Sequence, residues 1–399
     1  MTDSVEPKPL DVFIVVGEHS GDQLGAKLMG ALRHATGGAV AFRGVGGEAM
    51  ARAGLQSLFP LADIAVMGIS AVLARLPLLR RRILETVEAI VAARPGVLVI
   101  IDCPGFTHRV AKRVRRRLPW LPVVDYVSPS VWAWGSWRAR VMRAYVDQVL
   151  ALLPFEPAAQ ARLGGPATTY VGHPLVEALA ELRPGPAESQ RRDEVPPLVL
   201  VLPGSRRAEI TRLLPVFEAA VARVAAALAS VEFVLPAVSH LEPEIRAAVA
   251  TWRVKPRIVV GPSAKLEAFR AARAALAASG TVTLELALAG VPMVVGYRFS
   301  KLDEQLKYIV KVPSIVLPNL ILGRNAIPEL LQTNCTPERL ADALVPLIRG
   351  GPERDAQLAA LRKVNELMRL PTGQTPSELA AAIVVETAEG RRVDAPRVR

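Results

Sequence analysis

Short apolar runs recur along this chain, and each ends in a polar, glycine-containing turn followed by a helical pattern. The run from Leu10 to Val16 precedes the turn GEHSGD, and the run from about Val97 to Ile101 precedes the turn DCPGF. Apolar strands that alternate with helices are typical of parallel sheets covered on both faces. The sequence therefore predicts an α/β fold with doubly wound parallel sheets.

The strand–helix pattern occurs twice, on either side of a stretch with a different composition. Around Leu182–Pro197 the segment LRPGPAESQRRDEVPP is rich in Pro, Gly and charge and has no periodicity, which is typical of a linker. A chain of 399 residues also exceeds the usual size of one core. We predict a first domain over 1–180, a linker over 181–197 and a second domain over 198–355. From 356 to 399 we expect helices that pack back on the first domain, with a tail that frays beyond about Thr372.

Ligands of open α/β sheets bind outside the carboxyl ends of the strands. Two such domains that face each other leave an interdomain cleft for two substrates, so a cleft of this kind is the expected position of the active site.

The net charge of +12 indicates an anionic partner, which is a nucleic acid, an anionic membrane surface or an anionic small molecule. Aromatic residues make up only 5% of the chain, and neither a stacking motif nor a zinc-binding spacing occurs, which argues against nucleic acid. Cys103 and Cys335 do not indicate a disulfide scaffold, and the N-terminus lacks the pattern of a signal peptide. We therefore expect a cytoplasmic protein.

The segment AASGTVTLELALAGVPMVV, from Ala277 to Val295, contains one charged side chain, Glu285. The turn Ser279-Gly280-Thr281 precedes a predicted helix, whose N-terminal N–H groups and dipole attract phosphate. A carboxylate one turn further along can accept hydrogen bonds from a sugar diol. A capped helix with a buried, paired Glu285 explains the segment equally well.

The segment LPGSRRAEI, residues 202–210, has the same arrangement of strand, turn and helix. Arg206 or Arg207 can bind a diphosphate, and Glu209 can pair with one of them. An ordinary turn with solvated arginines is the alternative. Two such turns in one domain favour nucleotide binding, although neither is a P-loop nor a dinucleotide-binding motif.

Two acidic turns follow strands of the first domain. In VVGEHSGDQLGAKL, residues Glu18, His19, Ser20 and Asp22 follow the first strand, where Ser20 or Asp22 can also cap the helix. In IIDCPGF, Asp102 follows a buried strand directly, which makes it a candidate general base or a carboxylate that forms the turn itself.

Two further segments combine apolar and basic side chains. In YVSPSVWAWGSWRARVMRAYVD, residues 126–147, three tryptophans precede Arg138, Arg140 and Arg143, which suggests a loop that lines the cleft. In the stretch 65–93, apolar residues at helical spacing precede an arginine run at 80–82, which suits a membrane-surface helix, a lipid pocket or an ordinary buried helix. The apolar positions of that stretch expected to face membrane or acyl chains are Val66, Ile69, Val72, Leu73, Leu76 and Leu79.

The motifs taken together resemble one enzyme family. In order along the chain, VVGEHSGDQLGA, LADIAVMGISAVL, IDCPGF, YVSPSVWAW, LLPFE, VGHPLVE, LPGSRRAEI, ASGTVTLELALAGVPMVVGYR and LPNLILGR resemble the lipid-A-disaccharide synthases, over roughly Val12 to Gln332. The resemblance implies an inverting hexosyltransferase of the GT-B type, with two Rossmann-like domains. It implies transfer of 2,3-diacylglucosamine from UDP to 2,3-diacylglucosamine 1-phosphate in lipopolysaccharide biosynthesis, without cofactor or metal. It also implies a peripheral position on the cytoplasmic face of the inner membrane of a Gram-negative bacterium, and it leaves a homodimer open.

By position, the resemblance makes Asp102 the general base and Glu18 the acidic residue of the first loop. It ties Arg206 to the diphosphate, and it places the remaining matching positions at the substrates: Ser20, Asp22, Ser279, Gly280, Thr281, Glu285, Asn319 and Gln332. The chain departs from many relatives at Gly105, where they have a second Asp.

Other functions fit part of the pattern. A UDP-sugar epimerase, or a glycosyltransferase that acts on another lipid, would share the fold. A basic protein that binds nucleotides or nucleic acid is the non-enzymatic alternative, and the acidic turn at Glu18 and Asp22 argues against it.

Overall fold

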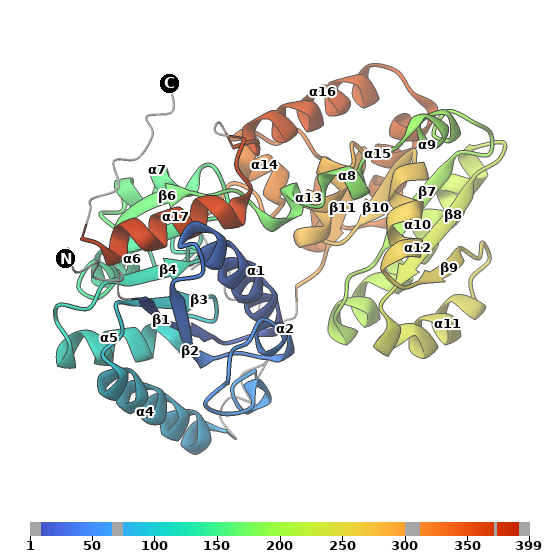
Figure 1. Ribbon diagram of the computed structural model, residues 1–399. Coiled ribbons are helices and arrows are strands. Elements are labelled where there is room, and N and C mark those ends of the chain that lie inside the picture. Colours follow the sequence, from blue (N-terminus) through green and yellow to red (C-terminus); the bar gives the residue numbers. More distant parts are fainter. Residues whose placement is uncertain (1–8, 66–74, 300–311, 371–372, 391–399) are drawn as a thin grey trace, which may run out of the picture. The chain divides into compact units, whose positions relative to one another are not determined.

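The computed structural model describes residues 9–65, 75–299, 312–370 and 373–390. The chain divides into two compact units (Figure 1). The first contains the residues up to Pro174 and those from Leu370 onward, and the second runs from Leu175 to Arg369. Each unit contains one six-stranded parallel sheet, so the two doubly wound α/β units predicted from the sequence are confirmed.

The sheet of the first unit has the strand order β2-β1-β3-β4-β5-β6. The expected strands at 10–16 and 97–101 are confirmed as β1 and β3. The strands of this sheet are β1 (Leu10–Val16), β2 (Val40–Val45), β3 (Val97–Ile101), β4 (Val123–Tyr126), β5 (Gln148–Ala151) and β6 (Ala167–Tyr170).

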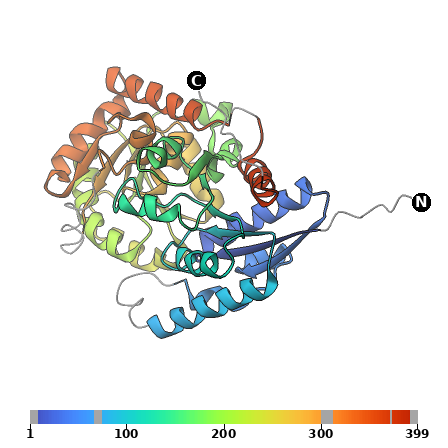
Figure 2. The ribbon, with the colours of Figure 1, turned by 90° about the vertical axis from the view of Figure 1, so that its left-hand side faces the viewer.

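Helices cover both faces of this sheet, with α1 and α17 packed together on one face and α4 and α5 on the other (Figures 1 and 2). The direction of winding requires this, because right-handed crossovers that run toward opposite edges place their helices on opposite faces. The helices of the unit are α1 (His19–Ala35), α2 (Glu48–Arg52), α4 (Leu76–Ala93), α5 (Thr107–Arg117), α6 (Trp137–Met142), α7 (Glu156–Arg162) and α17 (Pro376–Ala388).

The sheet of the second unit has the order β12-β11-β10-β7-β8-β9. Its strands are β7 (Leu198–Leu202), β8 (Glu232–Ala237), β9 (Arg257–Val260), β10 (Ala274–Ala277), β11 (Met293–Tyr297) and β12 (Glu329–Leu331). Its helices are α8 (Leu179–Leu182), α9 (Pro186–Arg191), α10 (Arg207–Ala227), α11 (Glu242–Ala250), α12 (Pro262–Ala271), α13 (Thr281–Leu288), α14 (Leu317–Leu322), α15 (Pro337–Arg349) and α16 (Pro352–Leu367).

The unit boundaries differ from the predicted domain boundaries. The expected linker at 181–197 contains α9 and is held to the second unit by Arg192, whose guanidinium donates to the carbonyl oxygens of Phe269, Arg270, Ala289 and Gly290. Helix α16 also belongs to the second unit, where its Gln357 side chain accepts a hydrogen bond from the Met293 backbone N–H. Within the expected C-terminal extension, only the part after Arg369 belongs to the first unit.

The expectation of a frayed tail beyond about Thr372 is wrong for residues 376–388, which form α17. Thr375 caps this helix, because its side chain accepts a hydrogen bond from the Glu378 N–H while the Glu378 carboxylate accepts one from the Thr375 N–H. Ala380, Ile383 and Val384 are buried in the core of the first unit. A capped helix with a buried apolar face is stable where a polar tail would not be.

Removing side-chain volume from α17 should therefore destabilise the first unit. We expect Ile383→Ala to lower its free energy of unfolding by about 2–5 kcal/mol and Ile383→Val by about 0.5–1.5 kcal/mol, because a buried cavity is left. Urea denaturation followed by tryptophan fluorescence measures this. Trp252 is the one tryptophan outside the first unit, so the fluorescence signal comes mainly from the first unit. Unchanged midpoints in both variants would show that α17 contributes little to the core.

Candidate active site

The second unit has a polar pocket at the carboxyl ends of its strands, where the strand order reverses between β7 and β10. Its volume is about 590 Å³. The loop after β7 supplies Gly204, Ser205 and Arg206, and the loop after β10 supplies Ser279, Gly280 and Thr281. The two turns that the sequence analysis selected thus line one pocket.

The β7 loop is held by Glu209, whose side chain is only 6% exposed. Its carboxylate accepts hydrogen bonds from the backbone N–H groups of Ser205 and Arg206 and lies 2.9 Å from the Arg206 guanidinium. The predicted pairing of Glu209 with an arginine is confirmed. Because the Arg206 side chain remains 66% exposed, it presents a positive charge to the pocket. Arg207 pairs with Glu244 instead.

The β10 loop opens α13 at the pocket. Gly280 has a φ of 149°, a backbone conformation that residues with a side chain rarely adopt. A Cβ added at Gly280 would have no neighbouring atom within 4 Å. The Ser279 hydroxyl donates to the Ile315 carbonyl oxygen at 2.7 Å, which fixes the turn. The N–H groups at the start of α13 therefore lie beside an open space that suits an anion.

Glu285 has a partner, which is Lys265 in α12. The Lys265 ammonium lies 2.6 Å from the Glu285 carboxylate, and both residues line the pocket. Lys265 was not among the predicted site residues. The turn GPSAK after β9 resembles the two selected turns, and this is the signal that could have indicated it.

Asn319 and Gln332 do not line this pocket. Asn319 is 2% exposed, and its side chain binds the backbone of Ala326 and Ile327, so it holds a loop. The Gln332 amide oxygen accepts a hydrogen bond from the Phe299 N–H. The Asn319 amide and the amide oxygen of Gln332 bind the backbone, whereas the sequence predicted substrate contacts for both residues.

In the first unit the strand order reverses between β1 and β3, and the expected acidic residues follow these two strands. Glu18 follows β1 and Asp102 follows β3. Gly17 permits the two loops to meet, because an added Cβ there would lie 2.2 Å from the Cys103 Cβ. Burial and the nearby carboxylates of Glu18 and Asp102 raise the pKa of Cys103 to about 11, so the thiol stays protonated.

Asp102 and Cys103 have φ values of 54° and 46°, a rare left-handed pair directly after a strand. The Asp102 carboxylate accepts a hydrogen bond from the Cys103 N–H at 2.7 Å, so the turn-forming role holds. Asp102 nevertheless lines a small cavity of about 160 Å³ with His108, Asp125 and Arg138. Strained backbone at a polar cavity is typical of a functional site.

His108 and Asp125 were not predicted as site residues. Nε2 of His108 lies 3.1 Å from the Asp125 carboxylate, and Nδ1 lies 3.1 Å from the Tyr145 hydroxyl. Burial raises the pKa of Tyr145 to about 12, so the phenol stays protonated and can donate to Nδ1, while Nε2 faces the Asp125 carboxylate. Asp125 is the one charged residue in the buried strand β4. The same pattern, a single charge in an apolar segment, was the reason for selecting Glu285 from the sequence.

The remaining acidic-turn residues have different roles. Asp22 is 4% exposed, and its carboxylate accepts hydrogen bonds from the N–H groups of Gly47, Ala49 and Met50 at the start of α2. Asp22 therefore anchors α2, in contrast to the predicted substrate contact or cap of α1. Ser20 and His19 are exposed.

The tryptophan-rich loop partly lines the Asp102 cavity, through Trp134 and Arg138. The Arg138 guanidinium stacks 3.8 Å from the Trp134 ring. Trp132 Nε1–H donates to Glu156 at 3.2 Å, and the same carboxylate accepts hydrogen bonds from the N–H groups of Leu152 and Leu153. Burial raises the pKa of Glu156 to about 7 despite these donors.

Comparison with known proteins identifies the family. The family model described as lipid-A-disaccharide synthetase matches residues 12–384. The chain belongs to the lipid-A-disaccharide synthase family. It is 54% identical to the lipid-A-disaccharide synthase of Nitrobacter winogradskyi, over 96% of both chains, and 52% identical to that of Rhodopseudomonas palustris, over 94% of this chain and 95% of the relative.

Solved structures with the same fold include two enzymes of low sequence identity. The UDP-GlcNAc 2-epimerase of Neisseria meningitidis, bound to UDP-GlcNAc, superposes with a TM-score of 0.58 at 12% identity, over 96% of this chain and 100% of that chain. Acinetobacter baumannii MurG superposes with a TM-score of 0.56 at 14% identity, over 95% and 100%. The predicted GT-B type of fold is confirmed. Membership of the lipid-A-disaccharide synthase family also confirms the predicted glycosyltransferase activity in lipid A disaccharide synthesis.

The buried carboxylate of Glu156 should make stability depend on pH. Because its pKa is about 7 in the folded state and near 4.5 otherwise, the folded state keeps a proton that the unfolded chain releases. The free energy of unfolding should therefore fall between about pH 4.5 and about pH 7, by up to about 3 kcal/mol from this residue. Glu156→Gln should remove this part of the dependence.

Denaturant titrations of the full chain at several pH values give the free energy of unfolding of the first unit, which is compared between wild type and Glu156→Gln. Parallel curves for the two proteins would contradict a raised pKa.

Proposed function

We propose that the chain transfers 2,3-diacylglucosamine from its UDP carrier to the 6-hydroxyl of 2,3-diacylglucosamine 1-phosphate, releasing UDP. The pocket at the β7/β10 reversal carries this proposal. It combines the exposed Arg206 guanidinium, the Lys265 ammonium, the carboxylates of Glu209 and Glu285 that pair with them, and the N-terminus of α13 in about 590 Å³. That set of groups suits a nucleoside diphosphate sugar, whose diphosphate needs positive charge and whose ribose offers two hydroxyls.

In this proposal Arg206, Lys265 and the N–H groups of the two loops stabilise the charge of the departing UDP. Glu285 accepts hydrogen bonds from the ribose hydroxyls. Within the described ranges no cluster of three His, Cys, Asp or Glu side chains could hold a metal ion. A reaction without metal or cofactor stays a prediction of the sequence.

The acceptor hydroxyl must lose its proton as it attacks the anomeric carbon on the face opposite UDP, which gives inversion. We assign the removal of this proton to Asp102, which lines a polar cavity in the first unit. Glu18, which follows the neighbouring strand, is the next candidate.

The expected membrane association is also part of the proposal. Among the helices that the structure describes, none is long and apolar enough to cross a bilayer. Leu76 is 43% exposed on α4, beside a basic groove, which supports a peripheral position on an anionic membrane. The predicted apolar positions Val66, Ile69, Val72 and Leu73 lie outside the described residues. A homodimer stays a prediction.

We expect Glu285→Gln to weaken UDP binding about tenfold or more, since it removes a charge-assisted hydrogen bond. Calorimetric titration with UDP and with 2′-deoxy-UDP tests the ribose contact. The wild type should bind 2′-deoxy-UDP more weakly than UDP, and the variant should bind the two alike. Glu267→Gln, an exposed carboxylate on α12 outside the pocket, is the control. Unchanged UDP affinity in Glu285→Gln would refute the assignment.

Asp102→Asn should lower turnover about 100-fold or more and leave UDP affinity unchanged, because a general base contributes only to the chemical step. The assay measures release of UDP from UDP-2,3-diacylglucosamine, with and without the acylated acceptor. Release that does not require the acceptor would favour an epimerase or hydrolase. A near-normal rate in Asp102→Asn would show that another residue is the general base, and Glu18→Gln would be tested next. Exposed Glu48→Gln serves as the control.

A further inference from the structure

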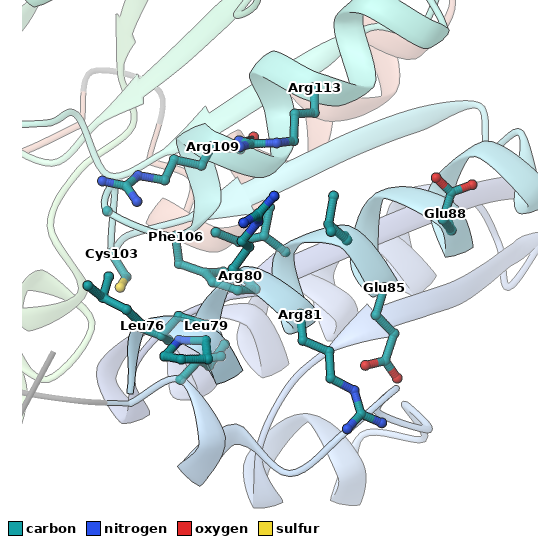
Figure 3. Close-up of a pocket in the computed structure, with 15 residues that line it drawn as sticks. Leu76, Leu79, Arg80, Arg81, Glu85, Glu88, Cys103, Phe106, Arg109 and Arg113 are labelled. Atoms are coloured by element: carbon teal, nitrogen blue, oxygen red, sulfur yellow. Dashed lines mark hydrogen bonds between the residues drawn. The ribbon is translucent and has the colours of Figure 1, made fainter. Parts of the chain in front are cut away.

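A large groove lies between α4 and α5 of the first unit and is not part of either pocket described above (Figure 3). Its volume is about 1220 Å³. This is larger than most metabolite pockets, which span about 300–1000 Å³. Cys103 and Gly105 line it at one end, so the groove reaches the turn that carries Asp102. An added Cβ at Gly105 would have no neighbour within 4 Å, which leaves this end open.

The groove has an excess of positive charge. Arg80 and Arg81 of α4 and Arg109 and Arg113 of α5 line it, and all four are exposed. In Figure 3 the side chain of Arg80 is directed from α4 toward α5, where Arg109 and Arg113 lie, whereas Arg81 is directed to the other side of α4. Three guanidinium groups from two helices are thus available to one ligand.

The two carboxylates that line the groove do not balance this charge. Glu85 is paired with Arg82 at 2.6 Å, and Glu88 is paired with Arg117 at 2.8 Å. Neither Arg82 nor Arg117 lines the groove. Arg82 is shared with Asp63 at 2.6 Å, but the four arginines that line the groove outnumber its two partnered carboxylates, so the remaining positive charge favours an anionic ligand.

The same groove has apolar walls. Leu76 and Leu84 are 43% and 47% exposed, and the more buried Leu79, Ile83 and Phe106 also line the groove. Exposed leucines beside unneutralised arginines suit a ligand that is both apolar and anionic. A free nucleotide or an unacylated sugar phosphate would leave the leucines in water.

We propose that this groove holds the acceptor lipid, with its phosphate monoester bound by Arg80, Arg109 and Arg113 and its acyl groups along Leu76, Leu79 and Leu84. The inference rests on the proposed function, because it takes the acceptor from there. Guanidinium groups bind phosphate oxygens through paired N–H donors, which gives orientation as well as affinity. Binding the phosphate in the groove would turn the sugar toward the Asp102 end.

The test compares two acceptors, 2,3-diacylglucosamine 1-phosphate and the same glycolipid without its phosphate, in neutral detergent micelles. The wild-type chain should have a lower KM for the phosphorylated acceptor. Arg109→Ala and Arg113→Ala should each raise this KM about tenfold with little change in kcat, and they should leave the KM of the dephosphorylated acceptor unchanged. Arg109→Lys, which keeps a charge but loses the paired donors, should fall between. Arg116→Ala, an exposed arginine of α5 outside the groove, is the matched control.

Direct binding of the phosphorylated glycolipid, measured without donor, separates this inference from the proposed function. Arginine-dependent binding of the glycolipid without any turnover would refute the proposed transferase reaction but would still support the groove as the phosphate-binding site. Equal losses on both acceptors, or an unchanged KM ratio in variants that still bind UDP, would overturn the phosphate contact. A variant that loses binding to anionic vesicles but keeps the KM ratio would assign the arginines to the membrane surface, which also overturns it.

Discussion

The hydrogen-bonded pairing of β1 with β3, and of β7 with β10, positions the turns that carry Glu18, Asp102, Arg206 and Gly280. In each unit these neighbouring strands are separated in sequence by at least one other strand, and the chain winds away from them in opposite directions. The helices that follow lie on opposite faces, so the loops at the carboxyl ends are not covered. In this way Glu18 and Asp102 both lie near Cys103 in the first unit, and Arg206 and Glu285 line one pocket in the second.

Much of this could be predicted from the sequence, because buried parallel strands and their turns have a local pattern. The positions of β1 and β3, the division into two units and the turns around Arg206 and Gly280 follow from it. Which polar side chain meets a ligand could not be predicted. A carboxylate or an amide near a turn gives the same pattern whether it binds a substrate or a backbone N–H, and Asp22 and Asn319 bind the backbone.

The groups that were missed depend on contacts between distant segments. Lys265 reaches Glu285 from another helix, and His108 reaches Asp125 from the helix after the preceding strand. The net charge also did not show which cationic side chains would face a ligand. Arg192 and Arg354 use their guanidinium groups on backbone carbonyls inside the second unit, so they contribute to the charge of +12 but do not face a ligand.

Helix α17 has a consequence for synthesis of the chain. The sheet of the first unit is complete once β6 has left the ribosome, but the apolar side of α1 still lacks its cover. That cover is translated only after the whole second unit. The nascent protein must therefore carry an unfinished core while the whole second unit is synthesised, a period in which chaperones and proteases can engage it.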